Sequence, residues 1–135
     1  MNSYKKLIIG FVGLLLASVA PLRAQSVVPF FDSGLVVGTD ANGNQISYQQ
    51  SFGYYTLDFF PYVYKYNNFG YIYYLGNNTS TDAYFFDFTT GDFFYTTPSL
   101  YPYFYSFNLK SFLYYFEGTK PRTFYNFATQ KIIVY

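Results

Sequence analysis

The sequence contains no cysteine, no histidine and no tryptophan. Without cysteine the chain forms no disulfide and no thiolate metal site, and it cannot be a lipoprotein anchored through a cysteine at its cleavage site. Without histidine it lacks Ser-His-Asp and Cys-His catalytic groups, the usual zinc sites, and haem held by His or Cys. Paired carboxylates, as in glycoside hydrolysis, are the remaining common catalytic device.

The carboxylates favour no catalytic pair. Asp40, Asp82, Asp92 and Glu117 fall in predicted turns, where a solvated loop residue is the plainer interpretation. Asp87 occupies a polar position that recurs along the chain, and we interpret that position as an outward-facing slot. The sequence also has no glycine-rich phosphate loop between a strand and a helix. We therefore predict that the protein is not an enzyme and binds no cofactor and no metal.

The N-terminus has the layout of a secretory signal peptide. A basic start with Lys5 and Lys6 precedes the apolar run "LIIGFVGLLLASVA" and the segment "PLRAQ". We predict a signal peptide over 1–24, cut between Ala24 and Gln25, and a secreted or cell-surface protein, with the periplasm as an alternative. An uncleaved membrane anchor is the competing interpretation, but the run is shorter than the roughly 20 apolar residues that span a bilayer.

Removal of residues 1–24 changes the sign of the net charge. Three of the eight basic residues are lost and all seven acids remain, so the charge falls from +1 to 5 − 7 = −2. Binding to nucleic acid or to a membrane surface through a basic face is disfavoured by this balance. We predict neither partner for the mature chain.

Residues 25–60 and 61–135 are predicted to form one domain. In the first part, "GLVVGTDANGNQISY" predicts a strand, a turn at Asn42-Gly43 and a second strand, and "FGYYTLDFF" predicts a further strand. The acidic and amide residues of this turn superficially resemble a calcium loop. Its glycine stands two places too early and the closing glutamate is replaced by Ser51, so a plain turn is favoured.

Four aromatic units follow one another in the second part, and they align without gaps. They are "YVYKYNNFGYIYY" (unit 1, 62–74), "YFFDFTTGDFFYT" (unit 2, 84–96), "YFYSFNLKSFLYY" (unit 3, 103–115) and "TFYNFATQKIIVY" (unit 4, 123–135). Position four of each unit is polar, and positions six to nine collect turn residues. The period of about 20 residues indicates a repeat architecture. Each unit is predicted to be an antiparallel β-hairpin, so the fold class is all-β, a meander or hairpin solenoid after the signal helix.

The rings are predicted to separate onto two faces. If position five faces ten and position three faces twelve, positions 1, 3, 5, 10 and 12 share a face, which we predict to be the core. The other face carries positions 2, 4, 11 and 13 and is interrupted by the polar fourth position. Its rings are our candidate ligand-binding residues, with packing between hairpins as the alternative role: Phe85, Phe104, Tyr115 and Phe124.

Two resemblances rest on these units. The stretch over about 48–135, including "YQQSFGYY", resembles the C-terminal repeats of uncharacterised secreted bacterial proteins with aromatic-rich β-hairpins, although those relatives often carry tryptophan where this chain has Phe112, Phe124 or Ile132. The strands "YIYYL" and "FLYYF" are similar to choline-binding cell-wall repeats. That resemblance implies only a hairpin-solenoid architecture, because the Gly-Trp pairs of that family are missing.

Two functions from different classes are compatible with this sequence. The first is a secreted, non-catalytic binding or cell-surface module that contacts a glycan or cell-wall polymer through rings the hairpins leave uncovered. The second is a structural, self-assembling extracellular β-protein, because "KIIVY" at 131–135 would form an apolar edge strand. Its partner would be the first strand of another copy, in a head-to-tail array, or the edge of a larger surface assembly. Alternatively, the N-terminal region would cover the edge within one chain.

Overall fold

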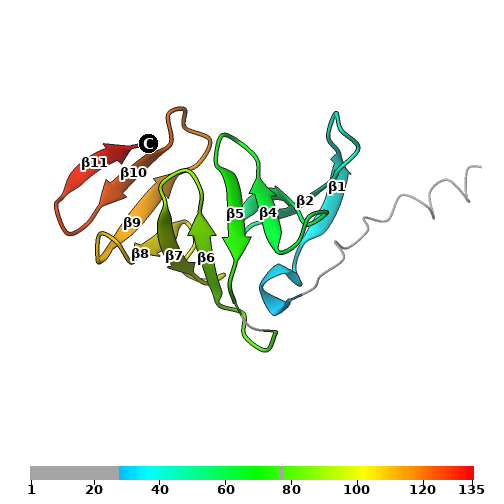
Figure 1. The fold of residues 1–135 in the computed structure, drawn as a ribbon, viewed down its shortest axis with the longest axis horizontal. Helices are drawn as coiled ribbons and strands as arrows, with labels where there is room; N and C mark the ends of the chain where they lie inside the picture. Colours follow the sequence, from blue (N-terminus) through cyan, green and yellow to red (C-terminus); the bar gives the residue numbers. More distant parts are fainter. Residues whose placement is uncertain (1–27, 77) are drawn as a thin grey trace, which may run out of the picture.

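The computed structural model describes residues 28–76 and 78–135, and within them it is a single antiparallel sheet of eleven strands in chain order (Figure 1). A short 3-10 helix, η1 (Pro29–Phe31), precedes the strands. The strands are β1 (Leu35–Thr39), β2 (Gln45–Gln49), β3 (Gly53–Thr56), β4 (Tyr62–Lys65), β5 (Gly70–Tyr74), β6 (Ala83–Asp87), β7 (Asp92–Thr96), β8 (Tyr103–Ser106), β9 (Ser111–Phe116), β10 (Thr123–Asn126) and β11 (Lys131–Val134). The prediction of an all-β chain of consecutive antiparallel hairpins is confirmed. The predicted signal peptide and its cut between Ala24 and Gln25 lie outside the described residues.

The turn between β1 and β2 lies around Asn42-Gly43, as predicted. Gly43 has φ +82°, which glycine adopts without strain. The Asp40 side chain accepts hydrogen bonds from the backbone N–H groups of Asn42 and Asn44, both at 2.9 Å. The Asn44 side chain also donates a hydrogen bond to the Asp40 carboxylate, so these two residues hold the ends of the loop together.

All four aromatic units form hairpins with one common register. Position one pairs with twelve, two with eleven, three with ten, and four with nine, as in Tyr62↔Tyr73 and Lys65↔Gly70 of unit 1. This register differs by two residues from the predicted one. Because side chains alternate with a period of two, a shift of two residues leaves every side chain on its predicted face.

A fifth, related unit precedes these four. In the β2–β3 hairpin, Tyr48 pairs with Tyr54 and Gln49 with Gly53, which are the pairings of positions three with ten and four with nine. Its loop is one residue shorter, so an alignment without gaps misses it. The dipeptide Phe-Gly at 52–53 and again at 69–70 marks the common turn.

The predicted inside and outside of the sheet are exchanged. Positions 2, 4 and 11 of units 1–3 point inward and are buried, whereas positions 1 and 10 of these units are exposed. The expectation that the ring-rich face is the core is therefore wrong, and so is the expectation that position four is an outward-facing slot. The polar fourth residue is buried in every unit: Gln49, Lys65, Asp87, Ser106 and Asn126.

Burial of this polar row is possible because each member has a partner. The carboxylate of Asp87 receives Arg122 Nη1 at 2.9 Å and Nη2 at 2.6 Å, and Lys65 Nζ lies 2.8 Å from Glu117 Oε1. Gln49 donates to the Phe30 carbonyl, Ser106 donates to Asp92, and Asn126 accepts from Ser111. A buried polar group costs little when its hydrogen bonds are replaced in this way.

The sheet curls so that its inner face closes on itself. Hairpin tips from the first half contact linkers from the second half: Asn68 Nδ2 donates to the Gly118 carbonyl at 3.1 Å, and Arg122 Nη1 donates to the Phe69 carbonyl at 2.7 Å. Phe69 also packs against Tyr115 with ring centroids 5.0 Å apart. A curled sheet offers more area on its convex side, so most of the large tyrosine and phenylalanine side chains of the units fit better outside than inside.

Candidate binding surface on the outer face

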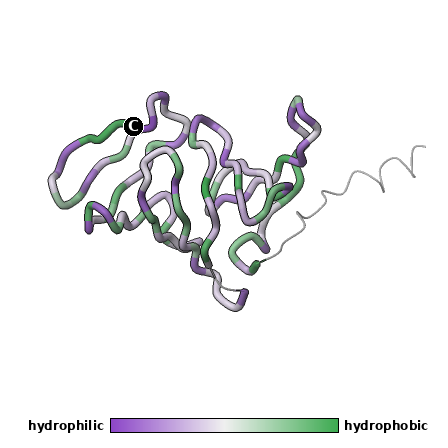
Figure 2. Tube along the Cα trace, viewed as in Figure 1, coloured by the Kyte–Doolittle hydropathy of each residue, from purple (hydrophilic) through white to green (hydrophobic). Residues whose placement is uncertain are grey.

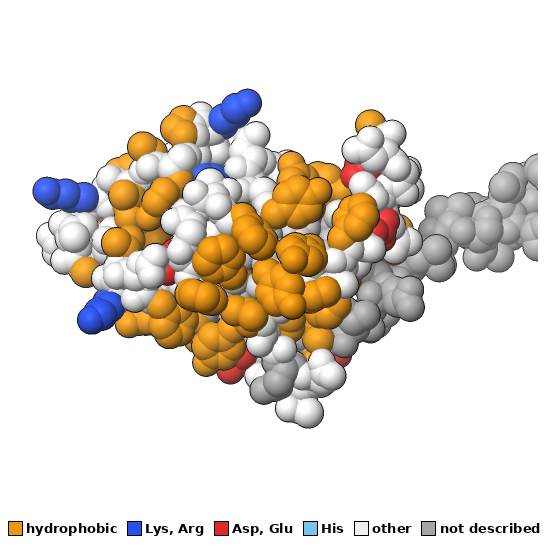
Figure 3. Space-filling view, viewed as in Figure 1, with side chains coloured by type: hydrophobic (Ala, Val, Ile, Leu, Met, Phe, Trp, Pro, Cys, Tyr) orange, Lys and Arg blue, Asp and Glu red, His pale blue; other side chains and the backbone are white. Residues whose placement is uncertain are grey.

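The convex face of the sheet is covered with half-exposed aromatic rings, which we call the outer aromatic face. It consists of positions 1, 3, 5, 10 and 12 of units 1–3, and all fifteen are Tyr or Phe. Space-filling side chains show a broad hydrophobic area across the middle of the molecule (Figure 3). Exposed apolar patches of this extent usually mark an interaction surface. Its most exposed members, all between 39% and 49% exposed, are Tyr62, Tyr71, Tyr84, Phe88, Phe93, Tyr103, Phe107 and Phe112.

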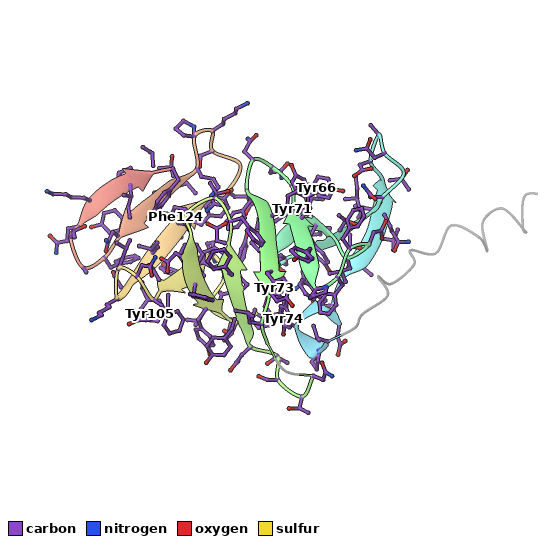
Figure 4. All side chains as sticks on the ribbon, in the orientation of Figure 1. Tyr66, Tyr71, Tyr73, Tyr74, Tyr105 and Phe124 are labelled. Carbon is purple, nitrogen blue, oxygen red and sulfur yellow. The ribbon has the colours of Figure 1, made fainter. Side chains whose placement is uncertain are left out.

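Rings on this face contact one another in a pattern that repeats with the hairpins. Within a hairpin, position three packs on position ten, as Tyr64 does on Tyr71 at 4.8 Å between centroids. Tyr71 and Tyr73 are neighbours on β5 on this face. Tyr105 on β8 occupies in unit 3 the position that Tyr64 occupies in unit 1 (Figure 4). Such pairs contribute about 0.5–1.5 kcal/mol each beyond their buried area. The outer rings are therefore held in place before any ligand arrives.

A second contact joins each hairpin to the next. Position one of each unit meets position five of the following unit: Tyr62 with Phe88 at 6.1 Å, Tyr84 with Phe107 at 6.4 Å, and Tyr103 with Phe127 at 5.8 Å. The Tyr62 and Phe88 rings are nearly parallel, with an interplanar angle of 19°. These contacts join the rings of each hairpin to those of the next hairpin.

An apolar groove of about 400 Å³ opens on the outer aromatic face between the second and third hairpins. Three exposed rings form its rim: Tyr84, Phe93 and Phe107. None of the described residues that line the groove is charged. The remaining lining residues are Leu75 and the buried Phe85 and Phe94. The groove can hold an apolar or ring-shaped group against aromatic walls.

A cleft of about 310 Å³ lies where hairpin tips of the first half meet the later strands. Its lining combines aromatic rings with hydrogen-bonding side chains: Tyr48, Tyr54, Tyr101, Tyr114, Tyr115, Gln50, Asn67 and Glu117, beside Gly53 and Pro102. The hydroxyl of Tyr101 donates to Glu117 Oε2. Burial, with Glu117 next in effect, raises the pKa of Tyr101, so this hydroxyl stays protonated and keeps its donor role at neutral pH.

Beneath this cleft, four aromatic rings of the same chain form a cage around the ammonium group of Lys65. Its Nζ lies 5.1–5.5 Å from the ring centroids of Phe52, Phe69, Tyr101 and Tyr115. Rings around an ammonium group attract it through their electron-rich faces. Burial lowers the pKa of Lys65, while the carboxylate of Glu117 acts in the opposite direction. Because Lys65 fills the cage, the cage cannot accept an external cation.

The four rings predicted as ligand-binding residues belong to the core. Phe85, Phe104 and Phe124 are 0% exposed and Tyr115 is 1% exposed. Phe124, on β10, packs with Phe94 and Tyr115 (Figure 4). The prediction that they lie on the less buried face is wrong, because the sheet curls toward positions 2, 11 and 13. These rings have the alternative role of packing between hairpins.

Comparisons with known proteins add no relative: no family model, curated protein or solved structure matches the chain. The resemblances to secreted aromatic-hairpin repeats and to choline-binding repeats stay predictions. Among the described residues, the structure has no helix that is both long and apolar enough to cross a membrane.

Proposed function

We propose that the protein is an exported, non-catalytic binding module that holds an extended glycan or cell-wall polymer on its outer aromatic face. One observation carries this proposal: fifteen rings in register, without a charged side chain among them, cover one face of the sheet, and three of them form the rim of an apolar groove. The apolar faces of sugar rings pack on aromatic rings, while tyrosine hydroxyls exchange hydrogen bonds with sugar hydroxyls. A polymer can contact several hairpins at once, since the ring contacts repeat from one unit to the next.

The groove rim is the part of this surface to test first. We would measure binding to a glycan array and to insoluble cell-wall and storage polysaccharides. A triple variant, Tyr84→Ala with Phe93→Ala and Phe107→Ala, removes the exposed rim. Stacking on one ring contributes on the order of 1–3 kcal/mol in nucleic-acid complexes. Loss of three rings should therefore weaken binding by at least about tenfold.

A matched control uses rings of similar exposure away from the groove. Phe59 and Phe116 are 52% and 38% exposed, and neither belongs to the fifteen rings or lines the groove. Replacing both with alanine should leave binding within about twofold of the original. Equal losses in both variants would indicate non-specific adsorption to hydrophobic surface. An array and a polysaccharide panel without any hit would contradict the proposal.

The competing function, a self-assembling structural protein, is supported by a different feature. Strand β11 pairs only with β10 among the described residues, and its Ile132 and Val134 side chains are 56% and 57% exposed. Residues 28–60 do not cover this edge, since β1 and β11 lie at opposite ends of the sheet (Figure 1). An uncovered, apolar edge strand favours pairing with another chain.

A further inference from the structure

The two edges of the sheet differ in how well they resist pairing with another chain. Strand β1 has an irregularity between Val36 and Gly38, where its register against β2 shifts. Bulges of this kind bend an edge strand and discourage association. Strand β11 has continuous register with β10 and contains no proline or glycine. It is also among the most hydrophobic stretches of the chain (Figure 2).

Hydrogen bonds on β10 and β11 identify which groups of β11 face outward. Tyr135 N–H donates to the Arg122 carbonyl at 2.9 Å, and this bond links the end of β11 to β10. Phe127 N–H donates to the Phe112 carbonyl at 3.2 Å, and this bond links the other side of β10 to β9. In an antiparallel pair, backbone groups alternate between the two sides of a strand. Ile133 and Tyr135 are therefore bonded toward β10, and the N–H and C=O groups of Ile132 and Val134 point to the free edge.

The number of strands decides the geometry of a pair that extends the sheet. Eleven strands in an antiparallel meander leave β1 and β11 running in the same direction. If β1 of a second copy lay beside β11 with the outer faces on one side, the two strands would be parallel. An antiparallel pair with the outer faces aligned requires β11 against β11, related by a two-fold axis perpendicular to the sheet. This disfavours the head-to-tail array and favours a closed dimer.

We propose that two copies of the chain associate through β11 about a two-fold axis that passes at Ile133. Ile132 then lies opposite Val134 of the partner subunit, and Val134 opposite Ile132 of the partner subunit. The outward-facing groups of these residues form about four backbone hydrogen bonds between the chains. The β-branched side chains at 132 and 134 cover one another on the outer face. Both outer aromatic faces become one surface, and this pairing is independent of polymer binding.

A cysteine at the axis tests the register directly, since the natural chain has none. At a non-hydrogen-bonded pair the two Cα atoms at 133 would be about 4.5 Å apart, within the range of a disulfide. The Ile133→Cys variant should convert most of the protein to a cross-linked dimer under mild oxidation. The Ile132→Cys control places the two Cα atoms about 8–9 Å apart and should stay unlinked. Equal cross-linking of both variants, or of neither, would overturn the proposal.

Sedimentation velocity on the exported protein tests the backbone contacts without cysteine. Val134→Pro removes an N–H that faces the free edge and leaves the bonds to β10 intact, so it should weaken the dimer at least tenfold. Val134→Thr keeps the N–H and the β-branched shape, and it should dissociate no more than about threefold more readily. Circular dichroism checks that both variants stay folded. Dimers that persist in the proline variant, a monomeric parent protein, or species that grow beyond the dimer would each contradict the two-fold pairing.

Discussion

Replacing Glu117 with glutamine should cost the fold more than replacing its buried partner. Lys65 Nζ is fully buried and lies 2.8 Å from Glu117 Oε1, and the second carboxylate oxygen accepts the Tyr101 hydroxyl. The glutamine variant keeps the ammonium group buried but removes the opposite charge. A Lys65→Met variant removes the buried charge itself and retains an unbranched chain of similar length among the same four rings.

The separation of the charges and their exposure set the expected size of the effect. At 2.8 Å, two unit charges attract by about 6 kcal/mol at an effective dielectric constant near 20. Glu117 is 39% exposed, so water screens part of this attraction. Removing one partner of a fully buried pair costs about 3–5 kcal/mol. For Glu117→Gln we expect about 2–3 kcal/mol, and for Lys65→Met about 1 kcal/mol or less.

Urea unfolding followed by the near-ultraviolet signal of the ordered rings measures both free energies. The double variant, Lys65→Met with Glu117→Gln, should resemble Lys65→Met alone, because the glutamine then faces no buried charge. Lys65 also predicts a pH signature. Burial holds its pKa below the ordinary value in the folded state, so Glu117→Gln should regain stability as pH rises toward 10.5 and the ammonium loses its proton. A Glu117→Gln cost below that of Lys65→Met would refute this account.

Two further outcomes follow from the inverted sheet and its buried hydroxyls. Phe85→Ala should cost about 3–5 kcal/mol of unfolding free energy and its neighbour Tyr84→Ala about 1 kcal/mol, both measured by urea titration; the reverse order would place the ring-rich face inside after all. Burial raises the pKa of Tyr115 to about 12 and also raises that of Tyr101, so the stability that these neutral hydroxyls contribute is complete below pH 10 and is lost as pH rises above it. The tyrosinate absorbance of these two residues, obtained by difference from Tyr101→Phe and Tyr115→Phe variants, should therefore appear together with unfolding. Early titration of both hydroxyls in the folded state would be evidence against their burial.

The hairpins could be predicted from the sequence because their signals are local. Alternating rings, turn residues at positions six to nine and the period near 20 residues all lie within single units. The predicted register was two residues from the observed one, and this error preserved the separation of the faces. The fifth unit, the β2–β3 hairpin, is missed by an alignment without gaps because its loop is one residue shorter. The Phe-Gly dipeptide that repeats at 52–53 and 69–70 is the sequence signal that indicates it.

The choice of inner face was not predictable because it depends on distant partners. Counting rings favours positions 1, 3, 5, 10 and 12 as the core, since the other face is interrupted at position four. Only the fold brings Glu117 to Lys65 and Arg122 to Asp87, at sequence separations of 52 and 35. Once those partners are in place, burying the polar row costs little. The candidate site was assigned to the wrong rings for the same reason.

The variable residue at position four gives the hairpins an order. Lys65 in unit 1 pairs with Glu117, and Asp87 in unit 2 pairs with Arg122. Both partners come from the single linker 117–122 between β9 and β10. If the two hairpins exchanged places, Lys65 would lie near the arginine and Asp87 near the glutamate, so each buried charge would face one of its own sign. The charge at position four thus fixes the order of hairpins whose aromatic residues are otherwise alike. A chain in which units 1 and 2 were exchanged would not form the curled sheet, even with every aromatic residue retained.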